Sequence, residues 1–187
     1  MTELGATASM VATLALAARV LGVLLFGAAL WFKARHFEEF TAIVARYLAS
    51  PLRLARYPAA AVVALEAATV LLMLWPQGAV VGAALAVTLL LCFAAAMTIA
   101  LARGERELDC GCMHSALRQR VRWSLVVRNI LMAAAFVPLL ASPALVPDGL
   151  VVLDGLAGGI VLFVLYLVAG VLIALDDSFA ELKRRYG

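Results

Sequence analysis

The sequence predicts an all-α membrane protein, a polytopic bundle of about five transmembrane helices forming a single membrane domain over residues 1–187. Of these residues, 66% are hydrophobic and 14% are charged, whereas soluble domains have roughly 45–50% apolar and about 25% charged residues. A water-soluble fold of this length cannot bury so much apolar surface. We therefore expect a lipid bilayer to surround the chain.

Five apolar stretches are long enough to cross a hydrocarbon core of about 30 Å, which requires about 20 residues of helix. They run over residues 9–32, 59–75, 79–101, 123–140 and 150–175. Residues that favour turns separate the later stretches, with Pro76-Gln77-Gly78 after the second and Pro147-Asp148-Gly149 after the fourth. The first stretch follows a start without basic residues and is longer than the core of a secretory signal, so we expect it to be retained as a helix.

An amphipathic helix is predicted directly after the first span, over about residues 37–50. Its apolar residues recur at helical spacing: Phe37, Phe40, Ile43, Val44, Tyr47 and Leu48. This pattern is typical of a helix that lies in the membrane interface. A cytoplasmic helix packed on the bundle would show the same pattern, so both interpretations remain open.

The distribution of Lys and Arg predicts the orientation of the chain. All the basic residues outside the spans lie after the first span, after the third, or at the C-terminus, while Arg19 and Arg128 lie within spans. By the positive-inside rule, the N-terminus lies outside and the C-terminus in the cytoplasm of a bacterial-type inner membrane. This topology also explains the net charge of +3, so we predict no nucleic-acid partner.

The densest group of reactive side chains lies between the third and fourth spans, in Asp109-Cys110-Gly111-Cys112-Met113-His114. A disulfide between Cys110 and Cys112 would close a very small ring, and strained disulfides are usually the labile or catalytic ones. Cys110, Cys112 and His114 could instead bind Cu(I), or Zn²⁺ with a further donor. The third interpretation is a pair of incidental reduced thiols.

Cys92 lies inside the third span and is interpreted as a small packed hydrophobic residue. The alternative is that it relays electrons with the loop cysteines, which requires the loop to fold back toward the membrane interior. An odd third cysteine also leaves intermolecular pairing, and with it a homo-oligomer, open.

Four polar residues lie inside the predicted spans, where each is costly unless it is paired or faces a cavity. They are Arg19 in the first span, Glu66 in the second, and Arg128 with Asn129 in the fourth. Arg19 and Glu66 could form an ion pair between adjacent helices, either to fix helix packing or as part of a proton-carrying or quinone-facing pocket. Lys33 and His36 are interpreted as interfacial groups that snorkel toward water.

Three pieces of the chain resemble the MauE-type branch of the DoxX-like membrane proteins, a family named for methylamine utilisation. One is the 24–40 run, LLFGAALWFKARHFEEF, and another is AVVALEAATVLLML with Glu66 near the start of a helix. The third joins the Cys110-Gly111-Cys112 loop to Arg128-Asn129. The similarity covers about residues 19–140, with Met113-His114 standing where the family usually has Phe-Gly.

The resemblance implies a DoxX-like core of four helices plus one further helix. It also implies a thiol-disulfide oxidoreductase that works with a thioredoxin-like partner in maturing an exported enzyme. Cys110 and Cys112 would exchange the electrons, with a quinone as the alternative partner, and Glu66 and Arg128 would shape a polar pocket nearby. The remaining alternatives are copper or zinc handling and a non-catalytic anchor subunit of an oxidoreductase complex.

The predicted topology conflicts with this function, because it places the Cys-Gly-Cys loop on the cytoplasmic side while a disulfide-forming partner would work outside. Either the loop re-enters the bundle and passes electrons across the membrane, with Cys92 as a stepping stone, or the reaction is with a quinone or a cytoplasmic thiol.

Overall fold

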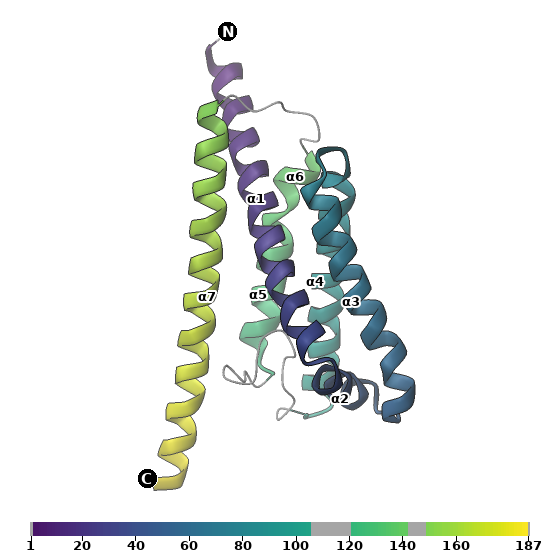
Figure 1. Ribbon diagram of the computed structural model, residues 1–187. Coiled ribbons are helices and arrows are strands. Elements are labelled where there is room, and N and C mark those ends of the chain that lie inside the picture. The colour runs from purple at the N-terminus through teal and green to yellow at the C-terminus, as the bar shows by residue number, and fades with distance from the viewer. Residues whose placement is uncertain (1, 106–120, 142–148, 187) are drawn as a thin grey trace.

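The computed structural model describes residues 2–105, 121–141 and 149–186, which form helices joined by short turns (Figure 1). The elements are α1 (Thr2–Arg35), α2 (Phe37–Leu48), α3 (Leu52–Leu74), the 3₁₀ turn η1 (Pro76–Gly78), α4 (Ala79–Ala102), α5 (Trp123–Ala135), α6 (Val137–Ala141) and α7 (Gly149–Tyr186). Within the described residues, five segments are long and apolar enough to cross a membrane: Thr7–Arg35, Leu52–Leu74, Pro76–Ala102, Trp123–Leu140 and Val151–Leu175. The predicted all-α bundle is confirmed, and the chain is a multi-pass membrane protein.

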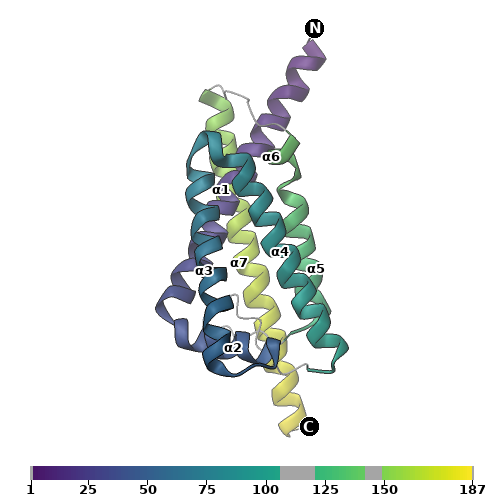
Figure 2. The ribbon, with the colours of Figure 1, turned by 90° about the vertical axis from the view of Figure 1, so that its right-hand side faces the viewer.

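α1 lies at the centre of the bundle. α7 packs along one side of it and α3 along another, α4 packs against α3, and α5 packs against α4 (Figure 1, Figure 2). Small side chains let these helices approach closely, as suits association in lipid, where packing rather than the hydrophobic effect holds helices together. The main core cluster contains Ala15, Ala18, Ala79, Ala83, Ala86 and Ala133 beside the larger Phe26, Met73 and Phe136.

α7 is the peripheral helix of the bundle. In the most apolar 18-residue stretch of α7, 11% of the residues are buried, against 44% in the corresponding stretch of α1. Glycines bring the two helices together, because a Cβ at Gly155 would come within 2.7 Å of Leu16 and one at Gly159 within 2.5 Å of Val20. The contact between α1 and α7 therefore depends on the absence of side chains at these two positions.

The second and fourth spans differ in detail from the sequence prediction. α3 begins at Leu52 rather than near Ala59, because hydropathy marks the part of a helix that lies in hydrocarbon and misses its more polar first turns. The fourth span is interrupted at Phe136 between α5 and α6. Pro138 explains this break, since proline lacks the N–H and its ring clashes with the carbonyl of the preceding turn.

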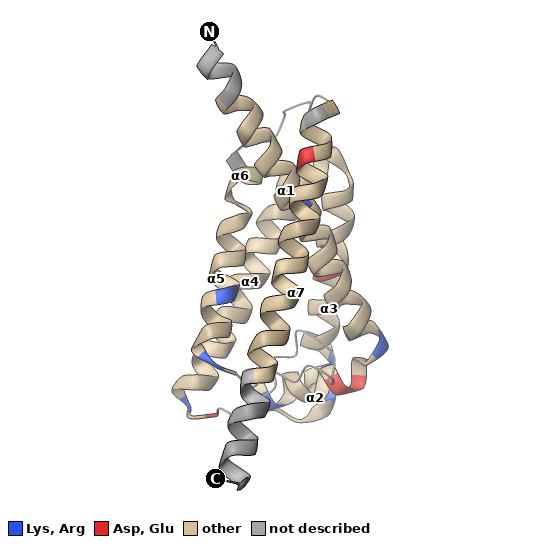
Figure 3. Cartoon of the chain, turned by 90° about the vertical axis from the view of Figure 1, so that its left-hand side faces the viewer, with Lys and Arg blue, Asp and Glu red and all other residues tan. Residues whose placement is uncertain are grey.

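Charged residues gather at one end of the bundle, around α2 and the adjoining ends of the spans (Figure 3). α2 lies across this end and packs against α3, with Phe40 and Thr41 buried (Figure 1). An exposed ion pair, Glu38 with Arg56, joins the two helices. We refer to this end as the α2 end.

Candidate functional site

A buried ion pair lies inside the bundle, between Lys33 of α1 and Glu66 of α3. The exposed fraction is 5% for Lys33 and 1% for Glu66, so the protein shields both charged groups almost completely. Charged groups in a membrane interior are expensive and are usually paired. Pairing makes this site neutral overall while keeping two ionisable groups in contact.

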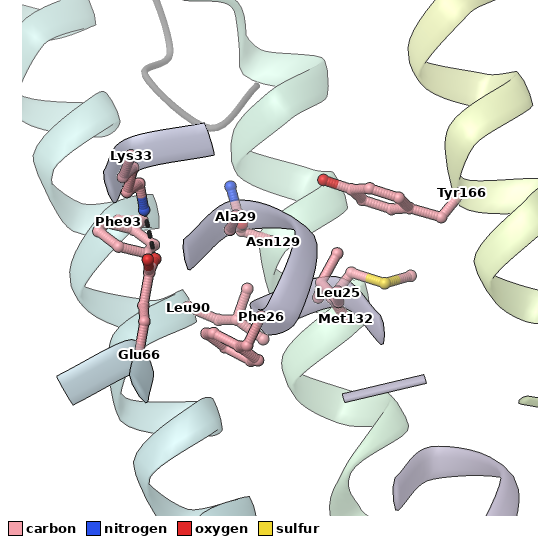
Figure 4. A pocket seen from close by; sticks show the side chains of 10 residues that line it. All are labelled: Leu25, Phe26, Ala29, Lys33, Glu66, Leu90, Phe93, Asn129, Met132 and Tyr166. Atoms are coloured by element: carbon pink, nitrogen blue, oxygen red, sulfur yellow. Dashed lines mark hydrogen bonds and ion pairs between the residues drawn. The ribbon is translucent and has the colours of Figure 1, made fainter. Parts of the chain in front are cut away.

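The position of Lys33 corrects the expectation that this side chain snorkels to water. Lys33 lies in the last turn of α1, yet it is buried and turned into the bundle (Figure 4). Side chains on a helix tilt toward its N-terminus, and α1 reaches the α2 end with its C-terminus. A lysine at that position is therefore directed back into the membrane interior, where it pairs with Glu66.

Two aromatic rings enclose the ammonium group of Lys33. Its Nζ lies 5.0 Å from the ring centroid of Phe40 in α2 and 4.8 Å from that of Phe93 in α4. At these distances the rings attract a cation through their negative faces. Lys33 is thus held by a carboxylate and by rings from two further helices.

A cavity of about 30 Å³ adjoins this pair. It is lined by residues of five helices: Leu25, Phe26, Ala29 and Lys33 of α1, Glu66 of α3, Leu90 and Phe93 of α4, Asn129 and Met132 of α5, and Tyr166 of α7 (Figure 4). Most of this lining is apolar, with polar groups from four of the five helices. The structure thus brings together two of the predicted site residues, Glu66 and Asn129.

One carboxylate oxygen of Glu66 remains available at this cavity. Lys33 donates to Oε1, whereas Oε2 is buried and has no hydrogen-bond partner among the described residues. The Asn129 side chain donates to the carbonyl oxygen of Leu125 at 3.0 Å, one turn earlier in α5, and this bond helps to fix its position in the lining. The site therefore has a buried acceptor that can take a hydrogen bond from a molecule in the cavity.

Arg128 lies beside the cavity without lining it. Its guanidinium carbon is 5.0 Å from the ring centroid of Tyr166, the residue that α7 contributes to the lining. Arg128 therefore connects α5 to α7 through this ring contact.

Arg19 does not pair with Glu66. Its side chain donates through Nε to the carbonyl oxygen of Met73 and through Nη2 to that of Leu74, at 2.8 Å. These carbonyls end α3, where no further turn supplies donors and the helix dipole favours a cation. Glu66 lies seven residues before Met73, about 11 Å along the axis, which places it beyond this contact.

The cysteines are only partly within the described residues. Cys92 is exposed on the surface of α4, so the expectation that it packs as a buried hydrophobic residue is wrong. Cys110, Cys112 and His114 lie outside the described residues. In the part of the chain that is described, no three His, Cys, Asp or Glu residues are grouped as a metal site.

The two ends of the segment that contains these cysteines can be placed. α4 ends at Ala102, and the chain is described again from Val121, which is buried with Ala94, Met97 and Leu125 of α4 and α5. Tyr47 of α2 packs against the same cluster. Both ends therefore lie at the α2 end of the bundle.

Comparisons with known proteins identify the family. A family profile described as "Methylamine utilisation protein MauE" matches residues 10–142. The chain belongs to the MauE family. It is 37% identical to the methylamine utilization protein MauE of Paracoccus denitrificans over 173 residues, which cover 91% of this chain and 93% of that protein. It is 39% identical to the MauE protein of Paracoccus versutus, over 86% of this chain and 89% of that protein.

The MauE match extends over most of the candidate site. Lys33, Glu66 and Asn129 fall within residues 10–142, as do Cys110 and Cys112, whereas Tyr166 of α7 lies beyond that range. No solved structure matches the chain.

Sequence reasoning missed several residues of this MauE-family site. It noted Lys33 without placing it inside the bundle, and it gave Phe93 and Tyr166 no role. The available signal was the position of Lys33 near the C-terminus of a helix, because the tilt of side chains makes an inward direction the natural one there.

Proposed function

We propose that this MauE-family protein is a membrane thiol-disulfide redox protein of the inner membrane, acting in methylamine utilisation through Cys110 and Cys112. Its partner is a thioredoxin-like protein, and its task is to support the maturation of an exported enzyme. The observation that carries the proposal is the Cys110-Gly111-Cys112 motif in a chain of this family. The assignment to methylamine utilisation comes from its relatives, which are named methylamine utilization proteins.

The exchange needs two thiols that act in turn. The thiolate of one cysteine attacks a disulfide of the partner, forming a mixed disulfide and releasing one partner thiolate. The second cysteine then attacks the mixed disulfide, which releases the other partner thiolate. The Cys110–Cys112 pair is thereby oxidised from dithiol to disulfide, and the partner disulfide is reduced to a dithiol. The reverse sequence would oxidise the partner.

The surroundings of the segment support its access to a partner in water. Its ends lie at the α2 end, where Arg103 and Arg122 flank it and Arg53 and Arg56 begin α3. Basic side chains near a cysteine favour its reactive thiolate form, whereas the acidic Glu105, next to the same segment, opposes it. By the positive-inside rule this end faces the cytoplasm and the N-terminus of the chain lies outside.

Labelling of the cysteines with a maleimide polymer tests the proposal. Intact cells and inverted membrane vesicles carrying the Cys92→Ser chain are labelled with and without prior reduction. We expect Cys110 and Cys112 to be labelled only after reduction, and the preparation in which labelling occurs reports the side of the membrane. Free labelling of both cysteines without reductant would contradict a resting disulfide.

Substitution separates the redox function from its alternatives. Cys110→Ser and Cys112→Ser should each abolish exchange, and the variant that keeps the attacking cysteine should accumulate the mixed disulfide with the partner. Full activity of the double variant would refute the redox function and favour an anchor subunit. Stoichiometric copper or zinc in the purified protein, lost in His114→Ala, would favour metal handling instead.

A further inference from the structure

We infer that the cavity beside Glu66 is a hydrated proton-binding site inside the membrane, with water as its ligand and Glu66 as its proton acceptor. This inference goes beyond the proposed function and does not depend on the cysteines. It rests on four observations: the buried pair, the second oxygen of Glu66, the size of the cavity and its polar lining.

The second oxygen of Glu66 calls for a hydrogen-bond donor. Oε2 is buried without a partner among the described residues, although Glu66 is paired through Oε1. A buried acceptor without a donor loses the hydrogen bonds that water would give it, so such atoms are rare in folded proteins. Because Glu66 also lines the cavity, a molecule held there is the natural donor.

The size of the cavity limits which molecule can be the hydrogen-bond donor to Glu66. A volume of about 30 Å³ is enough for one or two waters, since a single water needs a cavity of roughly 10–15 Å³. An aromatic ring or a lipid head group does not fit this space. Apolar cavities remain dry, but this one has a carboxylate, an ammonium group, an amide and a phenol in its wall, contributed by Glu66, Lys33, Asn129 and Tyr166.

The polar groups in the wall are enough to hold water. A buried water typically makes about three hydrogen bonds, with a range of 2–4. Glu66 Oε2 can accept one, and the ammonium group of Lys33 has N–H groups beyond the one that bonds Oε1. Asn129 and Tyr166 supply further donors and acceptors from α5 and α7 (Figure 4).

The proton step follows from the charges that face Glu66. When the pH falls, water in the cavity passes a proton from hydronium to Oε2. The O–H bond of the hydronium breaks and leaves neutral water, an O–H bond forms at Oε2, and the carboxylate becomes a neutral carboxylic acid. Lys33 keeps its charge between Phe40 and Phe93, so the pair changes from net zero to +1. Among the described residues, the other titratable group in the cavity wall is Tyr166 of α7, with Arg128 of α5 against its ring.

Infrared difference spectroscopy of the full chain in lipid nanodiscs tests this inference. Lowering the pH should produce a protonated-carboxyl C=O band that is absent in Glu66→Gln and retained in Glu38→Gln. Glu38 is the matched control because it pairs with Arg56 in the same way, but with 67% of its side chain exposed. The Lys33→Met/Glu66→Gln double variant should also lack the band, which covers the case in which Glu66→Gln alone fails to fold.

Deuterium exchange tests hydration in the unmodified chain. In D₂O the band should shift to lower frequency because water reaches the carboxyl group, and Asn129→Leu should slow this shift by removing a polar group from the cavity wall. A band that keeps its frequency in D₂O would show a dry site, and no band assignable to Glu66 would show a permanently ionised pair. Either result would overturn the inference, whatever the cysteine labelling shows.

Discussion

Replacing the Lys33–Glu66 pair in a double-mutant cycle measures what the pair contributes to the fold. Lys33→Met and Glu66→Leu each leave one buried charged group without its partner, and breaking a buried pair in this way costs about 3–5 kcal/mol. The double variant removes both charges and should lie within about 1 kcal/mol of the parent, because apolar residues of similar volume often replace a buried pair without loss. We expect this result because the two side chains are 5% and 1% exposed.

Equilibrium unfolding in mixed micelles, followed by circular dichroism, gives the free energy of unfolding of each variant. The control is the same cycle on Glu38 and Arg56, whose side chains are 67% and 58% exposed. An exposed pair contributes about 0–1 kcal/mol, so this control cycle should change stability little. If the two substitutions at Lys33 and Glu66 prove additive, the two charges are not energetically coupled, and Lys33 and Glu66 do not act as a pair.

Three further substitutions, one of them with a matched control, test other contacts by the same unfolding measurement. Gly159→Ala should cost about 1–3 kcal/mol by overpacking, since its Cβ would come within 2.5 Å of Val20, whereas the matched Gly158→Ala should cost nothing because its nearest neighbour is at 3.4 Å. Arg19→Met should cost about 1–3 kcal/mol by removing the donors to the end of α3. Cys92 is exposed, so the free energy of unfolding of Cys92→Ser should stay within about 0.5 kcal/mol of that of the parent. A larger loss of stability would mean that the thiol is packed.

The spans were predictable from the sequence because the bilayer imposes a simple requirement. Each backbone polar group in hydrocarbon must be bonded within its own helix, so length and hydropathy identify the spans. The same reasoning is insensitive to where a helix begins in the more polar region, as with Leu52 of α3. Hydropathy also predicted one continuous fourth span, although Pro138 lies within it and favours the observed break at Phe136.

The partners of the charged residues were less predictable. Arg19 bonds backbone carbonyls, which every residue carries, so no sequence pattern distinguishes Met73 and Leu74 as its acceptors. Glu66 was recognised as a candidate, but its partner depends on the direction of the Lys33 side chain and on how α1 lies against α3. Hydropathy counts a lysine at a span end as interfacial, whereas the geometry of α1 turns this one inward.

Phe93 connects the ion pair to the ends of the cysteine-containing segment. Its ring lies 4.8 Å from the Lys33 ammonium group and lines the cavity, and it also packs against the cluster that holds Val121. Phe93→Leu keeps an apolar side chain but removes the ring. The free energy of unfolding should therefore fall by about 0.5–2 kcal/mol more in the parent than in the Lys33→Met/Glu66→Leu background, where no cation remains.

The comparison between the two backgrounds isolates the cation–π contribution, because losses of ordinary packing occur in both. Equal costs would mean that Phe93 is a packing residue alone and that the ammonium group is held by Glu66 and Phe40. A larger cost in the parent would establish that Phe93 stabilises the charge on Lys33. The same ring contacts both the proposed proton-binding site and the cluster to which the cysteine-containing segment is joined.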